Sequence, residues 1–262
     1  MKSSVLIGVL AAVLFGVAAT PALAQLTTAP TPAVKANKRP KPAGADLTGV
    51  LAISNLSQRG ALDAQMKPLA GGFPYTDWAV AQRKAADPAL DPSAACIPAM
   101  PRNMGFPYPI QIVQSPGLVI VLMEAERLFR IIYTDDRPQP DDGDTPWLGD
   151  SVGHWEGDTL VADTRNINSK AWLDGQGTPI SDDLVITERF RKIDGGKRLE
   201  IVMKLDDPKV FRQPVYQRLV FNYKPDWQLK EYLCNEGNRD DVTKQKPGAE
   251  GSLKLQTPSP GN

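Results

Sequence analysis

Alternating apolar and polar residues, interrupted by short turn signals, fill most of the chain beyond Ile110. Runs of this kind that are rich in Val, Ile, Leu and aromatic residues predict β-strands whose side chains point alternately to the two faces of a sheet. The predicted strands are 46–53, 110–114, 118–124, 127–134, one that ends near Trp155, 159–164, 184–193, 198–205, 215–223 and 227–234. Most of the links are short, which is typical of an antiparallel meander. Closing the sheet protects its two edges, so we expect an all-β, calycin- or lipocalin-like barrel.

Two stretches depart from the strand pattern. Residues 76–86 begin with Thr76, a helix-capping residue, are rich in helix formers and stop at Asp87-Pro88, which predicts one short helix. Residues 88–109 form a long proline-rich loop that carries Cys96. A loop of this length in a compact domain is usually functional or well anchored. We expect it to pack over the barrel.

The chain ends differ from the middle. Residues 1–24 combine Lys2, an apolar run over 5–19 and Ala22-Leu-Ala24, the pattern of a Sec-type signal peptide. A retained anchor is disfavoured, because the run is shorter than the ~20 residues that cross a bilayer. We further predict a flexible Pro/Ala-rich linker over 25–45, one barrel domain over 46–237 and a disordered tail over 238–262. The mature protein is expected to be periplasmic or secreted, without stable membrane insertion.

Composition excludes some partners. The chain has 262 residues, is 42% hydrophobic, and carries 30 basic and 30 acidic side chains. Removal of Lys2 with the signal leaves one excess negative charge. The one short basic run, 35–41, lies in the predicted linker. Nucleic-acid binding is therefore not expected, because it normally requires a basic surface.

Cys96 and Cys234 are the two cysteines. In an oxidising compartment such a pair tends to form a disulfide, which we predict here; two separate buried thiols are the alternative. No short cysteine spacing occurs and His154 is the one histidine, so we expect neither a metal site nor a cofactor.

Charged residues interrupt three apolar strand faces. Glu188 lies between Ile186 and Phe190, Arg130 between Leu128 and Ile132, and Arg218 between Tyr216 and Val220. If these charges point inward they must pair, because an unpaired buried charge costs several kcal/mol. We therefore predict a pair between Glu188 and either Arg130 or Arg218. The alternatives are the opposite strand register or a structural ion pair at the barrel mouth.

The candidate catalytic residues are carboxylates and one arginine. Glu188, Asp174 or Asp182 could transfer a proton while Arg130 stabilises developing charge. Asp174 and Asp182, like Asp183, lie beside Gly and Ser, where acidic residues commonly serve as turn and cap residues instead. His154 stands on a predicted strand, which favours a structural role. No nucleophile-elbow, P-loop or dinucleotide-binding motif occurs.

Five segments carry distinctive motifs: 96–102, 107–117, 129–135, 153–164 and 187–191. The fourth contains Trp155-Glu-Gly-Asp-Thr-Leu-Val-Ala-Asp-Thr164. Together these segments resemble a widespread family of exported bacterial β-rich proteins that has no established activity, and the resemblance covers about residues 96–236. Family members usually carry histidine where Ile180 stands and an arginine-like residue where His154 stands. The resemblance implies a secreted bacterial β-rich protein and argues against a catalytic His154.

Three functions remain open at this point. The first is a periplasmic protein that binds a small apolar or aromatic molecule in a barrel cavity, with Trp155, Trp172, Tyr133 and Arg218 as candidate ligand contacts. The second is a cofactor-free lyase, isomerase or hydrolase that uses the carboxylates and Arg130. The third is an envelope interaction module that acts through the linker and tail. The sequence leaves the oligomeric state and the identity of the ligand open.

Overall fold

The computed structural model describes residues 44–141, 143–232 and 234. The predicted signal peptide, nearly all of the predicted linker and the predicted tail lie outside these residues. Among the residues described, no helix is both long enough and apolar enough to cross a membrane.

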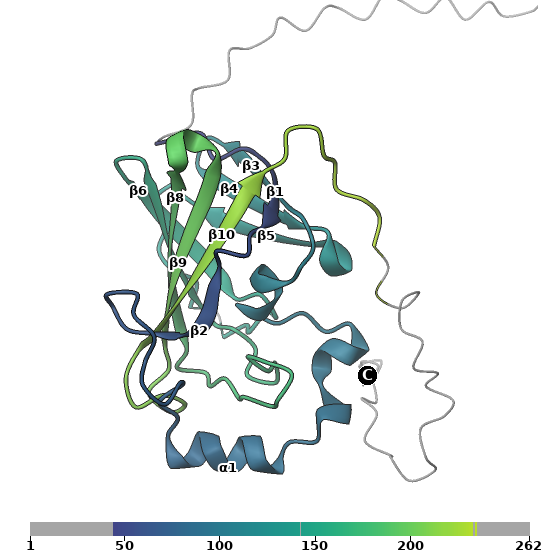
Figure 1. Cartoon of the computed structure of the whole chain (residues 1–262), viewed down its shortest axis with the longest axis vertical. Coiled ribbons are helices and arrows are strands. Elements are labelled where there is room, and N and C mark those ends of the chain that lie inside the picture. The colour runs from purple at the N-terminus through teal and green to yellow at the C-terminus, as the bar shows by residue number, and fades with distance from the viewer. Residues whose placement is uncertain (1–43, 142, 233, 235–262) are drawn as a thin grey trace, which may run out of the picture. The chain divides into compact units, whose positions relative to one another are not determined.

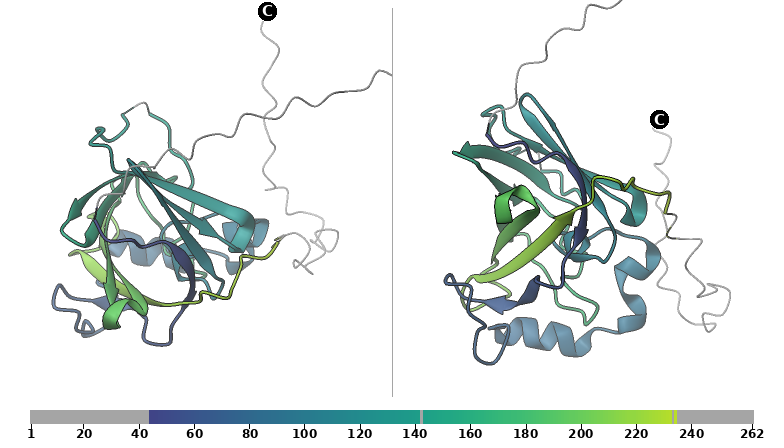
Figure 2. Two further views of the ribbon diagram at one scale, coloured as in Figure 1. Left: turned by 90° about the horizontal axis from the view of Figure 1, so that it is seen from above. Right: turned by 45° about the horizontal axis from the view of Figure 1, so that its top comes forward.

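A closed barrel forms the domain (Figure 1). Nine strands follow one another around it, β1 pairs with β10 to close it, and β2 lies outside, paired with β10. The strands are β1 (Gly49–Ile53), β2 (Gln58–Leu62), β3 (Ile110–Ser115), β4 (Leu118–Met123), β5 (Leu128–Tyr133), β6 (Asp150–Glu156), β7 (Thr159–Arg165), β8 (Val185–Ile193), β9 (Arg198–Asp206) and β10 (Val215–Tyr223). The predicted all-β barrel is thus confirmed, and Figure 2 shows its closure from above.

One strand pair breaks the predicted antiparallel meander. β5 and β6 are parallel and share a short ladder, Ile132 with Ser151 and Tyr133 with Val152. Parallel neighbours require the chain to return to the end at which it started. The crossover lies between the end of β5 at Tyr133 and the start of β6 at Asp150, and its sequence is acidic and proline-rich over 135–144. The barrel is therefore mixed rather than wholly antiparallel.

Two strand predictions are wrong. β2 was missed, because Gln-Arg-Gly-Ala-Leu is largely polar and contains a glycine. The last predicted strand, 227–234, is also wrong, because its described residues 227–232 belong to no strand; they run outside the barrel (Figure 1). Their anchors are local: the amide of Lys230 donates to Glu124 Oε2 at 2.7 Å, and the ring centroids of Tyr108 and Tyr232 are 4.8 Å apart.

The predicted helix is present as α1 (Asp77–Ala85). Thr76 caps it, because its Oγ1 accepts from the amide of Ala79 at 3.2 Å. The remaining helical elements among the described residues are five short 3₁₀ helices: η1 (Pro88–Leu90), η2 (Pro92–Ala95), η3 (Arg102–Gly105), η4 (Ala125–Arg127) and η5 (Asp194–Gly196).

The proline-rich loop is anchored covalently and ionically. Cys96 and Cys234 form the predicted disulfide across 138 positions of sequence. Within the loop, Arg102 holds Asp91 through two hydrogen bonds of 2.8 Å. The disulfide thereby joins the residue that follows η2 to the C-terminal segment outside the barrel.

Side chains fill the barrel interior. Ile112, Ile132, Phe190 and Phe221 are among the largest fully buried residues. This follows from strand alternation, which sends every second residue of each strand inward. The interior also contains a buried polar cluster, consisting of Arg130, Ser151, Thr164 and Glu188.

Candidate functional site

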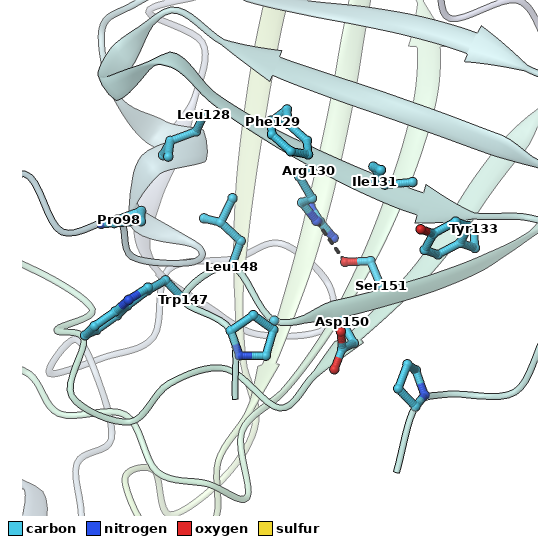
Figure 3. Close-up of a pocket in the computed structure, with 13 residues that line it drawn as sticks. Pro98, Leu128, Phe129, Arg130, Ile131, Tyr133, Trp147, Leu148, Asp150 and Ser151 are labelled. Atoms are coloured by element: carbon cyan, nitrogen blue, oxygen red, sulfur yellow. Dashed lines mark hydrogen bonds between the residues drawn. The ribbon is translucent and has the colours of Figure 1, made fainter. Parts of the chain in front are cut away.

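The candidate site is a pocket at the junction of β5 and β6, here called the seam pocket. The two strands pair at Ile132 and Tyr133 and then diverge toward Leu128, with the end of the crossover lying beside the gap (Figure 3). The pocket has a volume of about 310 Å³. Small-molecule sites begin at about this size.

The local backbone at the end of the crossover depends on Gly149. Its φ is +68°, and a Cβ there would lie 2.5 Å from the carbonyl oxygen of Arg165. Glycine alone combines this left-handed conformation with so close a backbone approach. The chain can therefore turn tightly into β6, which places Leu148 in one wall of the pocket and Ser151 in another.

Apolar and aromatic side chains make up most of the lining. β5 contributes Phe129, which is 64% exposed, together with Ile131 and Tyr133. The crossover contributes Trp147 and Leu148. The proline-rich loop supplies Pro98, so three segments that are far apart in sequence form one pocket. The guanidinium of Arg137 lies 3.6 Å from the centroid of the Tyr133 ring.

Arg130 forms the polar inner end of the pocket with Ser151. Arg130 extends from β5 toward Ser151 of β6, and its Nε donates to Ser151 Oγ at 3.0 Å (Figure 3). Behind them, Arg130 Nη1 donates to Glu188 Oε1 at 3.0 Å, and Nη2 donates to Glu188 Oε2. Arg130 is 2% exposed and Glu188 is fully buried. Of the two predicted partners of Glu188, the structure selects Arg130.

Arg218 belongs to a different network. Its Nε donates to Glu200 Oε1 at 2.7 Å, while Arg191 Nη2 donates to Glu200 Oε2 at 2.7 Å. Burial acts to raise the pKa of Glu200, but the hydrogen bonds and charges of Arg191 and Arg218 outweigh it and lower the pKa. Arg218 is therefore not part of the seam pocket.

Asp174 organises a loop beside α1. Its Oδ1 accepts from the amides of Gln176 and Thr178, and its Oδ2 accepts from Thr178 Oγ1 and from Arg83 Nη1 at 3.1 Å. Burial acts to raise the pKa of Asp174, but the hydrogen bonds from Thr178 and Gln176 and the charge of Arg83 outweigh it, so the pKa is lowered. This is the geometry of a turn-capping residue.

Asp182 and His154 lie on the surface. Asp182 is exposed, and its carboxylate makes no hydrogen bond within the described part of the chain. His154 Nε2 lies 3.3 Å from Glu156 Oε1, and both side chains are largely exposed. Asp174, Asp182 and Glu188 thus lie in separate environments.

Of the predicted aromatic contacts, Tyr133 lines the seam pocket. Trp155 instead packs at one barrel end, where a Cβ on Gly44 would lie 2.0 Å from its ring. Trp172 forms an isolated bridge with Pro179 in the loop between β7 and β8. Neither tryptophan belongs to the pocket lining.

Phe129, Trp147, Leu148 and Ser151 are pocket residues that the sequence reasoning did not single out. The apolar Trp147-Leu148 pair at the end of an acidic, proline-rich loop was the available signal, because apolar residues in a crossover usually pack against the sheet beneath.

A second pocket of about 390 Å³ lies beside the first and has a more polar lining, which includes Gln139, Asp141, Asp163 and Arg165. In the ranges that the structure describes, no group of three or more His, Cys, Asp or Glu side chains is placed to hold a metal ion.

The arrangement in the seam pocket is that of a binding site: a mostly apolar lining with three polar residues, Arg130, Asp150 and Ser151. Comparison with known proteins adds no assignment, because no protein-family model and no curated protein matches the chain.

Proposed function

We propose that this protein is exported to the bacterial periplasm or beyond, and that it binds one small apolar or aromatic molecule in the seam pocket. The observation that carries the proposal is the pocket of about 310 Å³, which is lined by Phe129, Ile131 and Trp147 and ends on Arg130. The site differs from a ligand cavity on the barrel axis, because large side chains occupy the interior.

Export is supported by two features. Residues 1–24 have the sequence pattern of a signal peptide. Cys96 and Cys234 form a disulfide, and such bonds persist in oxidising compartments. The resemblance to exported bacterial proteins points in the same direction.

The hydrogen bonds and positions of the three candidate carboxylates favour a binding function over acid–base catalysis. Both oxygens of Glu188 accept hydrogen bonds from Arg130 inside the barrel. Asp174 accepts hydrogen bonds within its own loop, and Asp182 is exposed. A general acid or base must reach its substrate within hydrogen-bonding distance, and these three carboxylates do not converge on the seam pocket. The interaction-module hypothesis depends on segments outside the described residues.

Native mass spectrometry tests the proposal on mature protein purified from the periplasm of its own source. We expect an additional small-molecule mass that disappears on denaturation. Ile131→Trp should abolish it, because Ile131 lines the pocket and the larger side chain occupies the space.

The matched control is Val113→Trp. Val113, Ile120 and Ile131 form one cross-strand row on adjacent strands, and Val113, two strands away, does not line the pocket. The control should retain the additional mass. If both variants lose the additional mass, or if neither does, the proposed location of the site is wrong. If the wild-type protein carries no additional mass and also fails to bind added aromatic compounds, the proposed function is wrong.

A further inference from the structure

Asp150 brings a carboxylate into the lining of the seam pocket. Its Oδ2 accepts a hydrogen bond from Asn166 Nδ2 at 2.9 Å, whereas its Oδ1 accepts none from the described residues. The described part of the chain places no basic side chain within 4 Å of either oxygen. The side chain is only partly buried. Asp150 can therefore accept hydrogen bonds from a ligand.

The strand register places this carboxylate beside the apolar wall. Ile132 and Ser151 pair with each other and are both buried in the barrel. Ile131 and Asp150, one position earlier on each strand, therefore face outward, and both line the pocket. Figure 3 shows the Asp150 and Ser151 side chains on opposite sides of β6. Phe129 lies two positions from Ile131 on the same face of β5, about 7 Å away at the ordinary rise of a strand.

Arg130 does not balance the charge of Asp150. Its guanidinium donates to both oxygens of Glu188, which is fully buried. On the crossover, Arg137 likewise donates to both oxygens of Asp135. Each of these arginines is already paired with a carboxylate, so the charge of Asp150 is uncompensated within the seam pocket.

The second pocket adds to the negative charge. It shares part of its lining with the seam pocket, and it contains the carboxylates of Asp141 and Asp163 and the guanidinium of Arg165. Once the paired Arg130 is set aside, the described lining of the two pockets has three carboxylates, with that of Asp150, against one arginine. A site with this excess of negative charge attracts cations and repels anions.

A cation with an aromatic body matches both the lining and the charge. An ammonium group has three N–H donors and no acceptor, which suits the Asp150 carboxylate. The aromatic body can pack against Phe129 and Trp147, which also line the pocket. Aromatic ring faces attract cations as well, and the Arg137 guanidinium already lies over the ring of Tyr133 in this pocket.

We propose that the ligand is an arylalkylammonium ion, that is, an aromatic ring joined by a short alkyl chain to a protonated amine, and that Asp150 binds the ammonium group. This inference rests on the proposed binding function and specifies its ligand class. It assigns Asp150 as a specificity-determining residue of the pocket.

Three compounds of similar size and different charge test the inference on the mature, disulfide-bonded protein. They are the cation 2-phenylethylammonium, the neutral 2-phenylethanol and the anion 3-phenylpropanoate. In NMR titrations at pH 7, we expect the cation to bind about tenfold more tightly than the alcohol, because hydrogen bonds between charged groups are stronger than those of a neutral hydroxyl. The anion should bind most weakly.

Variants show whether Asp150 acts directly. Asp150→Asn should reduce the preference for the cation to about twofold and leave the affinity for 2-phenylethanol unchanged, since asparagine keeps an oxygen for Asn166. Asp158→Asn is the matched control, because it makes the same change in net charge at an exposed turn residue beyond the other end of β6. That strand has seven residues and is about 20 Å long, more than a Debye length at physiological ionic strength. The control should retain the preference.

The outcomes separate the two proposals. Equal affinities for the cation and the alcohol, tighter binding of the anion than of the alcohol, or equal effects of Asp150→Asn and Asp158→Asn would overturn the inference and leave the binding function intact. If none of the three compounds binds up to its solubility limit, or if Ile131→Trp leaves their affinities unchanged, the proposed function itself fails.

Discussion

Arg130 and Glu188, which are 58 positions apart in sequence, meet inside the barrel through two hydrogen bonds between β5 and β8. Both side chains are almost completely buried. A buried ion pair is weak evidence for net stabilisation, but removal of one partner leaves an uncompensated charge. The pair therefore makes the fold sensitive to either substitution, and it also provides the polar inner end of the seam pocket.

Glu188→Gln should lower the free energy of unfolding by about 3–5 kcal/mol, because Arg130 keeps its charge without a counter-ion. Urea denaturation at pH 7 measures the change. Glu156→Gln is the control: Glu156 also pairs with an arginine, Arg189, but both side chains are about half exposed, so its loss should cost less than about 1 kcal/mol.

The double variant Arg130→Met/Glu188→Leu should recover most of the loss, since well-packed apolar residues often replace a buried pair without net cost. If Glu188→Gln instead retained wild-type stability and abolished a turnover, the acid–base hypothesis would be favoured.

The Cys96–Cys234 disulfide should stabilise the folded protein mainly by restricting the unfolded chain. It closes a loop of 138 positions, for which the chain-entropy relation gives about 4–5 kcal/mol. The Cys96→Ser/Cys234→Ser variant should show this loss in urea denaturation. Addition of a reductant is the control, since it should destabilise the wild type and leave the variant unchanged; a reductant effect of equal size on both proteins would contradict the prediction.

Gly149→Ala should be strongly destabilising and should disturb the seam pocket. The alanine would adopt a left-handed φ, which costs about 1–2 kcal/mol, and its Cβ would also meet the Arg165 carbonyl oxygen. Gly157→Ala separates the two effects, because Gly157 has φ +59° but nothing within 4 Å of its added Cβ. Thermal unfolding should show a clearly larger decrease in melting temperature for Gly149→Ala, and equal decreases would mean that the close approach is unimportant.

Glu200 should contribute a pH-dependent part of the stability. Its folded-state pKa lies below the ordinary value of 4.5, so the contribution is fully present above pH 4.5 and is lost as the pH falls through the lowered pKa. Glu200→Gln should therefore be less stable than the wild type at pH 7, with a difference that narrows below pH 4.5. Urea denaturation between pH 3 and pH 7 tests this, and parallel profiles would contradict it.

The inward pairing of Glu188 was accessible from sequence because strand alternation is a local property. Once Ile186 and Phe190 face the core, Glu188 must face it too. The choice between Arg130 and Arg218 was not accessible, because it depends on which strands lie next to each other around the barrel. Arg130 of β5 reaches Glu188 of β8 inside the barrel, whereas Arg218 of β10 pairs with Glu200 on the neighbouring strand β9.

The seam pocket could not be predicted for the same reason. It exists because residues 134–149 return the chain to the starting end of β5, so that β6 pairs in parallel over two positions and then diverges. Nothing in the alternation of β5 or β6 encodes the direction of its neighbour. The sequence also failed to predict β2 as a strand and wrongly predicted segment 227–232 as one. Whether such a segment becomes a strand depends on whether another strand pairs with it, and its local residue pattern does not reveal this.

The sequence by itself determined the all-β class, the short helix and the two cysteines available for a disulfide, because each follows from local periodicity, capping or composition. Only the tertiary structure decided the parallel seam, the identity of the ion pair and the residues of the pocket, because these depend on which distant segments the closed barrel brings into contact.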